Sequence, residues 1–380
     1  MGDLCASDFS GRRWSATYHL TGSASDAKAR AELLCIEQTV ESADHIIPPG
    51  AIREHLLGQV AEFRCVREER YEAVLTYPVE LLDESVGSLL HVAYGSASLQ
   101  RGVRLADIRI PQTELSRWDG PRFGTAGLRK LLGVSDRSLA CGVLKPLGLS
   151  ASQLADLARD FALGGIDIVK DDQGLADHRF CSFTERVSRC AEAVAEASAR
   201  TGQRCLYAPH LTGSFARILE QADYAHRAGA GAALVCPGIV GFDQIAELVR
   251  QKALGLPILS HPALMGSYYV ARDAGIAPHI IFGLMPRLAG ADVTIYPTFG
   301  LNYPISREDG RAIATACRCT LGHLPAIFPT AAGRMGPTRI SEMADVYGND
   351  LVYVLGSELH GNQGNVREAC RAFLRQLRIE

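Results

Sequence analysis

The chain has 380 residues, which is long for one ordinary domain and suits a barrel of roughly 250 residues with an appended domain. Apolar residues make up 47% and charged residues 21%, a globular composition that excludes a largely disordered protein. The net charge of −3, with mixed signs throughout, excludes a basic nucleic-acid-binding face and a cationic membrane-surface helix. We therefore expect a small-molecule partner.

The cysteines and the apolar runs indicate the cellular compartment. The eleven cysteines are scattered, and the closest pair, Cys317 and Cys319, lacks the CxxC spacing of a zinc or redox site. We expect reduced thiols that are mostly buried. No signal peptide precedes the first polar segment, and no run of about 18 apolar residues could span a bilayer. These features predict a cytoplasmic protein.

The first hundred residues mix strand and helix patterns. An extended segment at 14–20 is followed by an alanine-rich helix around 24–37 and by a strand-like segment at 71–77. This β-α-β opening predicts an α+β domain of the ferredoxin-like kind over residues 1–120, in which helices cover an antiparallel sheet.

After residue 138 short apolar runs recur every 25 to 36 residues, with amphipathic segments between them. This rhythm is typical of βα repeats around a parallel sheet. Eight such runs predict an α/β fold with a (β/α)8 barrel over residues 121–380. An open doubly wound sheet is less favoured, because no GxGxxG follows the first of these strands. The predicted strands are 139–145, 166–170, 205–210, 232–236, 257–261, 292–296, 326–328 and 351–355.

The most informative motif is Lys170-Asp171-Asp172, at the end of the second predicted barrel strand. A lysine in this position can capture CO2 as a carbamate and, with neighbouring carboxylates, hold Mg2+. The structural alternative is a surface charge pair that follows a strand.

Other polar residues follow the predicted barrel strands, and the active site of this fold lies at the carboxyl ends of its strands. Lys145, His210 and His261 are the titratable examples. Such groups can exchange protons with a sugar, which favours proton abstraction beside a carbonyl. The alternatives are histidines satisfied by backbone partners, and a structural ion pair between Lys145 and Asp172.

Two glycine-containing segments follow the last two strands, Gly333-Arg334 and Gly356-Ser357. Backbone N–H groups there form the usual phosphate site of the fold. Tight turns that use glycine at positive φ are the alternative.

Several motifs together resemble the Rubisco large subunit, and the resemblance covers nearly the whole chain. The two signature-like stretches are 145–150, KPLGLS, and 164–172, GGIDIVKDD. Further similar segments are 16–18, 35–39, 94–96, 109–111, 261–263 and 347–350. The resemblance implies the same two-domain fold and an active site shared across a homodimer.

The departures from the Rubisco pattern indicate a different activity. The first signature lacks the second lysine after Pro146, and Gln173 replaces the glutamate that serves as third metal ligand. Pro262 stands where Rubisco has the arginine of the distal phosphate site, and Cys236-Pro237 replaces a His-Asp pair. The segment 297–303 contains no lysine. The chain thus resembles the Rubisco-like proteins, which keep enolisation and lose CO2 fixation.

The resemblance also implies roles for individual residues. Carbamylated Lys170, Asp172 and, less securely, Gln173 would hold Mg2+, and Lys145 would transfer the proton. His261 would relay a proton or stabilise charge on an oxygen, and His210 would be a polar pocket residue. Gly333, Gly356 and Ser357 would bind a single phosphate, and Arg334 offers a cation beside them. Glu37 and Ser96 would come from the partner subunit of the homodimer.

Among Rubisco-like activities, residues 35–41 and 145–149 look most like the branch that isomerises 5-methylthioribulose 1-phosphate in methionine and sulfur salvage. Its pocket would have an apolar end, for which Pro262, Cys236, Phe299 and Tyr296 are suitable. Three alternatives stay open: a diketo-methylthiopentyl phosphate enolase, a transcarboxylase and hydrolase of 3-oxo-isoapionate 4-phosphate, and a non-catalytic paralogue. Gln173 is the main support for the last, because losing an anionic ligand weakens Mg2+ binding.

Overall fold

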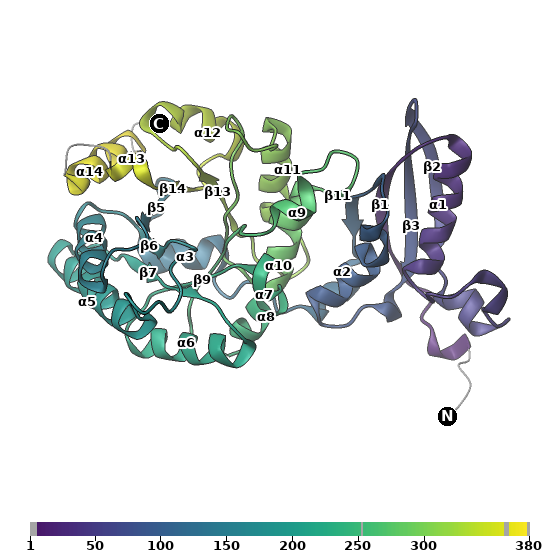
Figure 1. Cartoon of the computed structure of the whole chain (residues 1–380), viewed down its shortest axis with the longest axis horizontal. Coiled ribbons are helices and arrows are strands. Elements are labelled where there is room, and N and C mark those ends of the chain that lie inside the picture. Colours follow the sequence, from purple (N-terminus) through teal and green to yellow (C-terminus); the bar gives the residue numbers. More distant parts are fainter. Residues whose placement is uncertain (1–5, 252–253, 361–364, 378–380) are drawn as a thin grey trace. The chain divides into compact units, whose positions relative to one another are not determined.

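The computed structural model describes residues 6–251, 254–360 and 365–377. The chain folds into two compact units (Figure 1). The first unit comprises Met1–Trp118 with two later segments, Met265–Ile281 and Leu321–His323. The second unit comprises Asp119–Leu264, Phe282–Thr320 and Leu324–Glu380.

The first unit is built on a sheet with the strand order β11-β4-β1-β3-β2. Its first four strands in the chain pair in antiparallel fashion and alternate with helices as β-α-β-β-α-β, so the predicted ferredoxin-like arrangement is confirmed. Side chains alternate along β1, where Trp14, Ala16, Tyr18 and Leu20 are buried. The elements are β1 (Arg13–Thr21), α1 (Ala24–Glu37), β2 (Gln59–Arg67), β3 (Arg70–Pro78), α2 (Val86–Tyr94), β4 (Val103–Arg109), α9 (Gly266–Tyr269) and β11 (Gly275–Ile276).

The strand β11 was not predicted from the sequence. It lies far along the chain and pairs in parallel with β4, with Gly275 opposite Arg104. The Arg104 guanidinium donates to the carbonyls of Ala271 and Ala274, and the Tyr94 hydroxyl accepts from the Gly275 N–H at 2.6 Å. A two-residue strand carries no periodic pattern, so only these tertiary contacts define it.

The second unit is the predicted (β/α)8 barrel (Figure 1). Its parallel strands run in the order β7-β6-β5-β14-β13-β12-β10-β9-β8. The third strand of the barrel is interrupted at Pro209, which has no N–H to donate, and this gives the two short pieces β7 and β8. The strands are β5 (Leu139–Leu144), β6 (Ile168–Asp171), β7 (Leu206–Ala208), β8 (His210–Leu211), β9 (Ala233–Val235), β10 (Ile258–Ser260), β12 (Val293–Thr294), β13 (Phe328–Ala332) and β14 (Val352–Leu355).

Helices follow the strands and surround them (Figure 1). Ser150, Ser182 and Ser214 begin three of these helices by accepting a backbone N–H from the first turn. The helices are α3 (Gly124–Leu132), α4 (Ala151–Leu163), α5 (Phe183–Thr201), α6 (Phe215–Arg227), α7 (Pro237–Val240), α8 (Asp243–Arg250), α10 (Met285–Ala289), α11 (Arg307–Arg318), α12 (Ile340–Tyr347), α13 (Ser357–His360) and α14 (Val366–Leu377). No helix in the described ranges combines the length and the apolar character that crossing a membrane requires.

The barrel interior is filled by alternate strand residues, which form one apolar cluster. Near the amino ends of the strands a buried ion pair joins Arg137 to Asp167, with N···O distances of 2.7 and 2.8 Å. The Asp167 carboxylate also accepts the Ala140 N–H. These contacts tie the start of β5 to the start of β6, which fixes the strands whose other ends carry the predicted site.

Ten cysteines fall within the described ranges, and all ten are free thiols. Eight of them are buried, and Cys65 and Cys319 are exposed. The expectation of mostly buried cysteines is thereby confirmed for this part of the chain, and their reduced state stays a prediction.

Candidate active site at the barrel mouth

Strand periodicity gathers the predicted titratable residues over the barrel interior. Val143, Ile168, Ala208, Leu234 and Leu259 belong to the interior cluster. Because successive side chains of a strand alternate between its faces, residues two positions further on point the same way. Those residues are Lys145, Lys170, His210, Cys236 and His261, all at the carboxyl ends of their strands.

Lys170 is buried, with 2% of its surface exposed, so the alternative of a surface charge pair is wrong. Burial lowers the pKa of its amine, while the nearby Asp172 and Asp171 oppose that shift. Its Nζ donates to the Asp171 carbonyl at 2.8 Å. A lysine with a lowered pKa has more of the uncharged amine, which is the form that adds to CO2.

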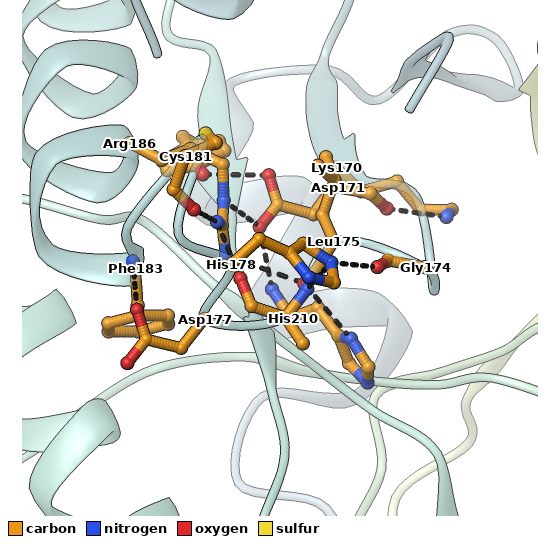
Figure 2. A network of polar contacts seen from close by, with 12 residues as sticks. Lys170, Asp171, Gly174, Leu175, Asp177, His178, Cys181, Phe183, Arg186 and His210 are labelled. Atoms are coloured by element: carbon orange, nitrogen blue, oxygen red, sulfur yellow. Dashed lines mark hydrogen bonds and ion pairs between the residues drawn. The ribbon is translucent and has the colours of Figure 1, made fainter. Parts of the chain in front are cut away.

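Asp171 points the other way from Lys170, as Figure 2 shows. Its carboxylate, which is fully buried, accepts from the Arg186 Nε at 3.0 Å, the Tyr207 hydroxyl at 2.8 Å and the His210 N–H at 3.1 Å. These three donors use the lone pairs of both carboxylate oxygens. The two adjacent carboxylates of the motif therefore differ. Asp171 is held by three hydrogen bonds within the protein, whereas Asp172 follows it at the mouth of the barrel.

The donors fit a Mg2+ site. Asp172 is half-buried and Gln173 is exposed, so neither side chain is enclosed by the protein. Together with a carbamate on Lys170 they would offer oxygen donors only, which suits Mg2+, an ion that also keeps waters and substrate oxygens as ligands. In the parts of the chain that the structure describes, no group of three or more His, Cys, Asp and Glu side chains is arranged to hold a metal.

His210 and Cys236 form a buried pair. The His210 Nδ1 lies 3.3 Å from the Leu175 carbonyl, which can only accept, so Nδ1 carries the proton and donates. The neutral Nε2 then accepts the Cys236 thiol proton over 3.3 Å. Burial lowers the pKa of His210 and raises that of Cys236 to about 11. His210 thus hydrogen-bonds to the backbone, as expected if its role is structural. It also hydrogen-bonds to Cys236 within the site.

Lys145 follows β5, which pairs with β6, and His261 follows β10, which pairs with β9. Burial lowers the pKa of His261 well below its ordinary value, and the charges of Lys170, His210 and Lys145 add to the shift. His261 is therefore a neutral imidazole near pH 7, and its Nδ1 accepts the Ala263 N–H at 3.2 Å. No ion pair joins Lys145 to Asp172 in the described ranges, and the structural clamp that this pair would form is not observed.

The predicted phosphate segments follow β13 and β14. A Cβ on Gly356 would lie 3.6 Å from the Lys145 Nζ, so this glycine brings the backbone close to the lysine. Gly333 and Arg334 both have positive φ, 94° and 46°, which is what the alternative of a tight turn predicts for that segment. Ser357 begins α13, and its side chain lies outside the described part of the structure. A phosphate at these segments stays a prediction.

Glu37 and Ser96 belong to the first unit. Glu37 ends α1, and Ser96 follows α2 in a short 3-10 turn. The buried Gln38 side chain links the two positions, because it donates to the Val92 carbonyl at 2.8 Å and accepts the Ala97 N–H at 3.0 Å. The structure thus holds Glu37 and Ser96 near one another within that unit, and their role in a neighbouring subunit stays a prediction.

Most of the residues that were predicted to line an apolar end of the pocket are buried within the protein. Tyr296 is buried against Phe282, with ring centroids 5.7 Å apart. Phe299 lies between the guanidinium groups of Arg307 and Arg339, at 5.2 and 5.7 Å. Cys236 is also buried, and among the four only Pro262 keeps appreciable exposure.

Arg186 and Tyr207 were missed by the sequence reasoning. Both contact the Asp171 carboxylate from the outer side of the strand layer. The signal that could have found them is the period of two, because Lys170 faces the interior and Asp171 must then face the surrounding helices. Which helix residue meets Asp171 is a tertiary contact with no local pattern.

Comparison with known proteins places this geometry in a family. Residues 124–373 match the family described as ribulose bisphosphate carboxylase large chain, catalytic domain, which is more than half of the chain. The first relative is ribulose bisphosphate carboxylase-like protein 1 of Rhodopseudomonas palustris, 36% identical over 90% of this chain and 91% of that protein.

A second relative is 5-methylthioribulose-1-phosphate isomerase of Rhodospirillum rubrum, 36% identical over 95% of both chains. Among solved structures, a Rubisco-like protein from Rhodopseudomonas palustris matches with a TM-score of 0.86 and 34% identity, over 96% of this chain and 97% of that one. The expected two-domain fold and the resemblance noted from the sequence are confirmed. This chain belongs to the Rubisco large-chain family, as one of its Rubisco-like proteins.

Proposed function

We propose that this protein enolises a ketose monophosphate and acts as a 5-methylthioribulose 1-phosphate isomerase in methionine and sulfur salvage. The observation that carries the proposal is the buried Lys170 at the barrel mouth, beside Asp172 and the neutral His261. The relative from Rhodospirillum rubrum that bears this activity in its name supports the choice of substrate.

Lys170, as a carbamate, Asp172 and Gln173 would hold Mg2+. When bound, the metal would polarise the carbonyl and hydroxyl oxygens of the substrate, which acidifies the proton between them. Burial favours the uncharged amine of Lys170, which is the form that adds to CO2, and bound Mg2+ would balance the negative charge of the carbamate.

Lys145 is the proposed group that moves the proton at carbon. It follows β5 over the barrel interior, next to Gly356, and the charges of Lys145 and Lys170 both act on His261. His261 is held neutral and its Nδ1 accepts the Ala263 N–H, so Nε2 carries the proton and can donate it to a substrate oxygen. Removal of one carbon-bound proton and return of a proton to the next carbon moves the carbonyl along the sugar chain.

The phosphate would lie at Gly333, Arg334, Gly356 and Ser357, where backbone N–H groups follow the last two strands. Pro262 and Cys236 occupy positions where the Rubisco pattern has charged groups, so neither position supplies a cation for a second phosphate. A thioether suits that end better than a phosphate.

The first test is incubation with 5-methylthioribulose 1-phosphate, Mg2+ and bicarbonate in D2O, followed by proton and phosphorus NMR. We expect a new ketose phosphate that carries deuterium. The Lys145→Ala variant should stay folded and lose turnover by about 10²–10⁴-fold, the usual contribution of general acid–base catalysis.

Deuterium in unchanged substrate without product would indicate an enolising site for another sugar phosphate, such as the diketo-methylthiopentyl phosphate. No change in either spectrum from a folded protein would contradict the proposal and favour cleavage of a sugar acid phosphate or a non-catalytic role. Full activity of Lys145→Ala would remove Lys145 from the mechanism.

We also propose a homodimer in which Glu37 and Ser96 of one subunit complete the site of the other. Exposed apolar side chains on the segments that follow the barrel strands support a partner there, because exposed apolar side chains are typical of protein interaction sites. They are Leu147, Phe180, Ile239 and Tyr303, each 50–56% exposed.

A shared site predicts complementation between two inactive variants, Lys170→Met and Glu37→Gln. Co-expressed subunits that pair at random should recover about a quarter of the wild-type activity, because only mixed dimers contain one intact site. Activity that stays at the level of the separate variants would contradict a shared site, and light scattering would show whether the dimer forms.

A further inference from the structure

We propose that Arg186 is a positioning residue for the metal site, because it fixes both ends of the short loop that carries Asp172 and Gln173. The inference rests on the proposed function, in which these residues hold Mg2+. It assigns a role to a side chain on the helix side of the strand layer, whose hydrogen bonds go to Asp171, Leu175, Ala176 and Cys181.

The Arg186 guanidinium hydrogen-bonds to several residues at the end of β6 and in the segment that follows it (Figure 2). The side chain comes from α5 and has no exposed surface. Its Nε donates to the Asp171 carboxylate at 3.0 Å, and its two terminal nitrogens donate to the carbonyls of Ala176 at 2.8 Å, Leu175 at 3.4 Å and Cys181 at 3.5 Å. One rigid guanidinium therefore holds residues of this segment from Asp171, at the end of β6, to Cys181.

The same anchors have further support. The Asp171 carboxylate also accepts from the Tyr207 hydroxyl and the His210 N–H, and the Leu175 carbonyl also meets the His210 Nδ1. Between the anchors Asp171 and Leu175 lie only residues 172–174, closed by the Leu175 N–H on the Asp172 carbonyl at 2.9 Å. The two proposed ligands thus occupy a loop of three residues whose ends cannot shift independently.

The guanidinium is suited to this task in a way that an ammonium group is not. Arginine offers five N–H groups in a planar fork, so it can hold the carboxylate and the carbonyls at once. Lysine would keep the positive charge beside Asp171 but meet fewer acceptors. Loss of such supporting contacts usually weakens metal binding by 10–100-fold.

The experiment compares Arg186→Lys with Arg137→Lys in the full-length protein. Arg137 is the matched control, because it is also a buried arginine paired with a strand aspartate of the same barrel, at the opposite ends of the strands. Mn2+ would be titrated in bicarbonate buffer and the free ion followed by electron paramagnetic resonance. We expect about 10–100-fold weaker binding for Arg186→Lys and wild-type binding for Arg137→Lys, although both variants lose thermal stability.

If Arg186→Lys does not fold, a second pair of variants with smaller structural changes can test the same inference. Tyr207→Phe removes one donor from the Asp171 carboxylate. Tyr353→Phe, on β14, removes a buried hydroxyl that donates to the Ile340 carbonyl of α12 at 3.1 Å. We expect roughly threefold to tenfold weaker Mn2+ binding for Tyr207→Phe, the effect of one hydrogen bond. Tyr353→Phe should bind as the wild type does.

The outcomes separate this inference from the proposed function. Wild-type affinity in Arg186→Lys or in Tyr207→Phe would overturn the positioning role and leave the metal site standing. Equal weakening in a variant and its control would also overturn it, because general destabilisation would then explain the loss. No binding by the wild-type protein would overturn the metal site and the positioning role together.

Discussion

Replacing Lys170 with methionine is expected to abolish turnover while the protein stays folded. Methionine keeps the length of the side chain but can neither form a carbamate nor carry charge. We expect a loss of at least about 10³-fold in kcat, equivalent to roughly 4 kcal/mol of transition-state stabilisation. The measurement is kcat with 5-methylthioribulose 1-phosphate, together with thermal unfolding followed by circular dichroism.

The stability of the Lys170→Met variant should equal or exceed that of the wild type. Lys170 is buried and burial lowers the pKa of its amine, so the native site tolerates the cation at a cost that methionine removes. Lys130, an exposed lysine of α3, provides the control, and Lys130→Met should keep full activity. Retained activity in Lys170→Met would exclude Lys170 from the mechanism.

Replacing Arg137 with methionine is expected to have the opposite pattern, a large loss of stability with little effect on the chemistry of the folded enzyme. The guanidinium makes two short contacts to Asp167, and both side chains are at most 6% exposed. Although burial works against its charge, Asp167 raises the pKa of Arg137 above the ordinary value. Removing the cation leaves a buried carboxylate uncompensated, which typically costs 3–5 kcal/mol.

Urea unfolding followed by tryptophan fluorescence would measure the loss. The exposed pair Arg227–Asp223 on α6 is the comparison, since Arg227→Met should cost at most about 1 kcal/mol. A free energy of unfolding within 1 kcal/mol of wild type for Arg137→Met would show that the buried pair contributes little to the barrel.

Much of the site was predictable from the sequence, because its side chains lie at the carboxyl ends of the barrel strands. The eight apolar runs placed Lys145, Lys170, His210 and His261 at the ends of successive barrel strands, and the structure has them above the barrel interior. The period of two in a strand and the common polarity of parallel strands are local rules, so a sequence suffices to apply them. The same rules predicted the ferredoxin-like unit from its first strand and helix.

Other features follow from no local rule. Pro209 interrupts the third barrel strand, and β11 joins the sheet of the first unit from a segment far along the chain. By residue type and spacing, the two carboxylates of Lys170-Asp171-Asp172 are equivalent, and only the resemblance to Rubisco singled out Asp172. The packing of α5 against β6 supplies a physical difference between them, because it brings Arg186 to Asp171 and leaves Asp172 at the mouth.

The sequence by itself determined the fold class, the family resemblance and the side chains at the barrel mouth, since periodicity and motif spacing are properties of neighbouring residues. The tertiary structure alone decided which of those side chains are held by the protein and which are free to act. Burial lowers the pKa of Lys170, and the Leu175 carbonyl fixes the tautomer of His210. Both effects arise from groups that are distant in sequence or from the exclusion of water, and no local pattern records either of them.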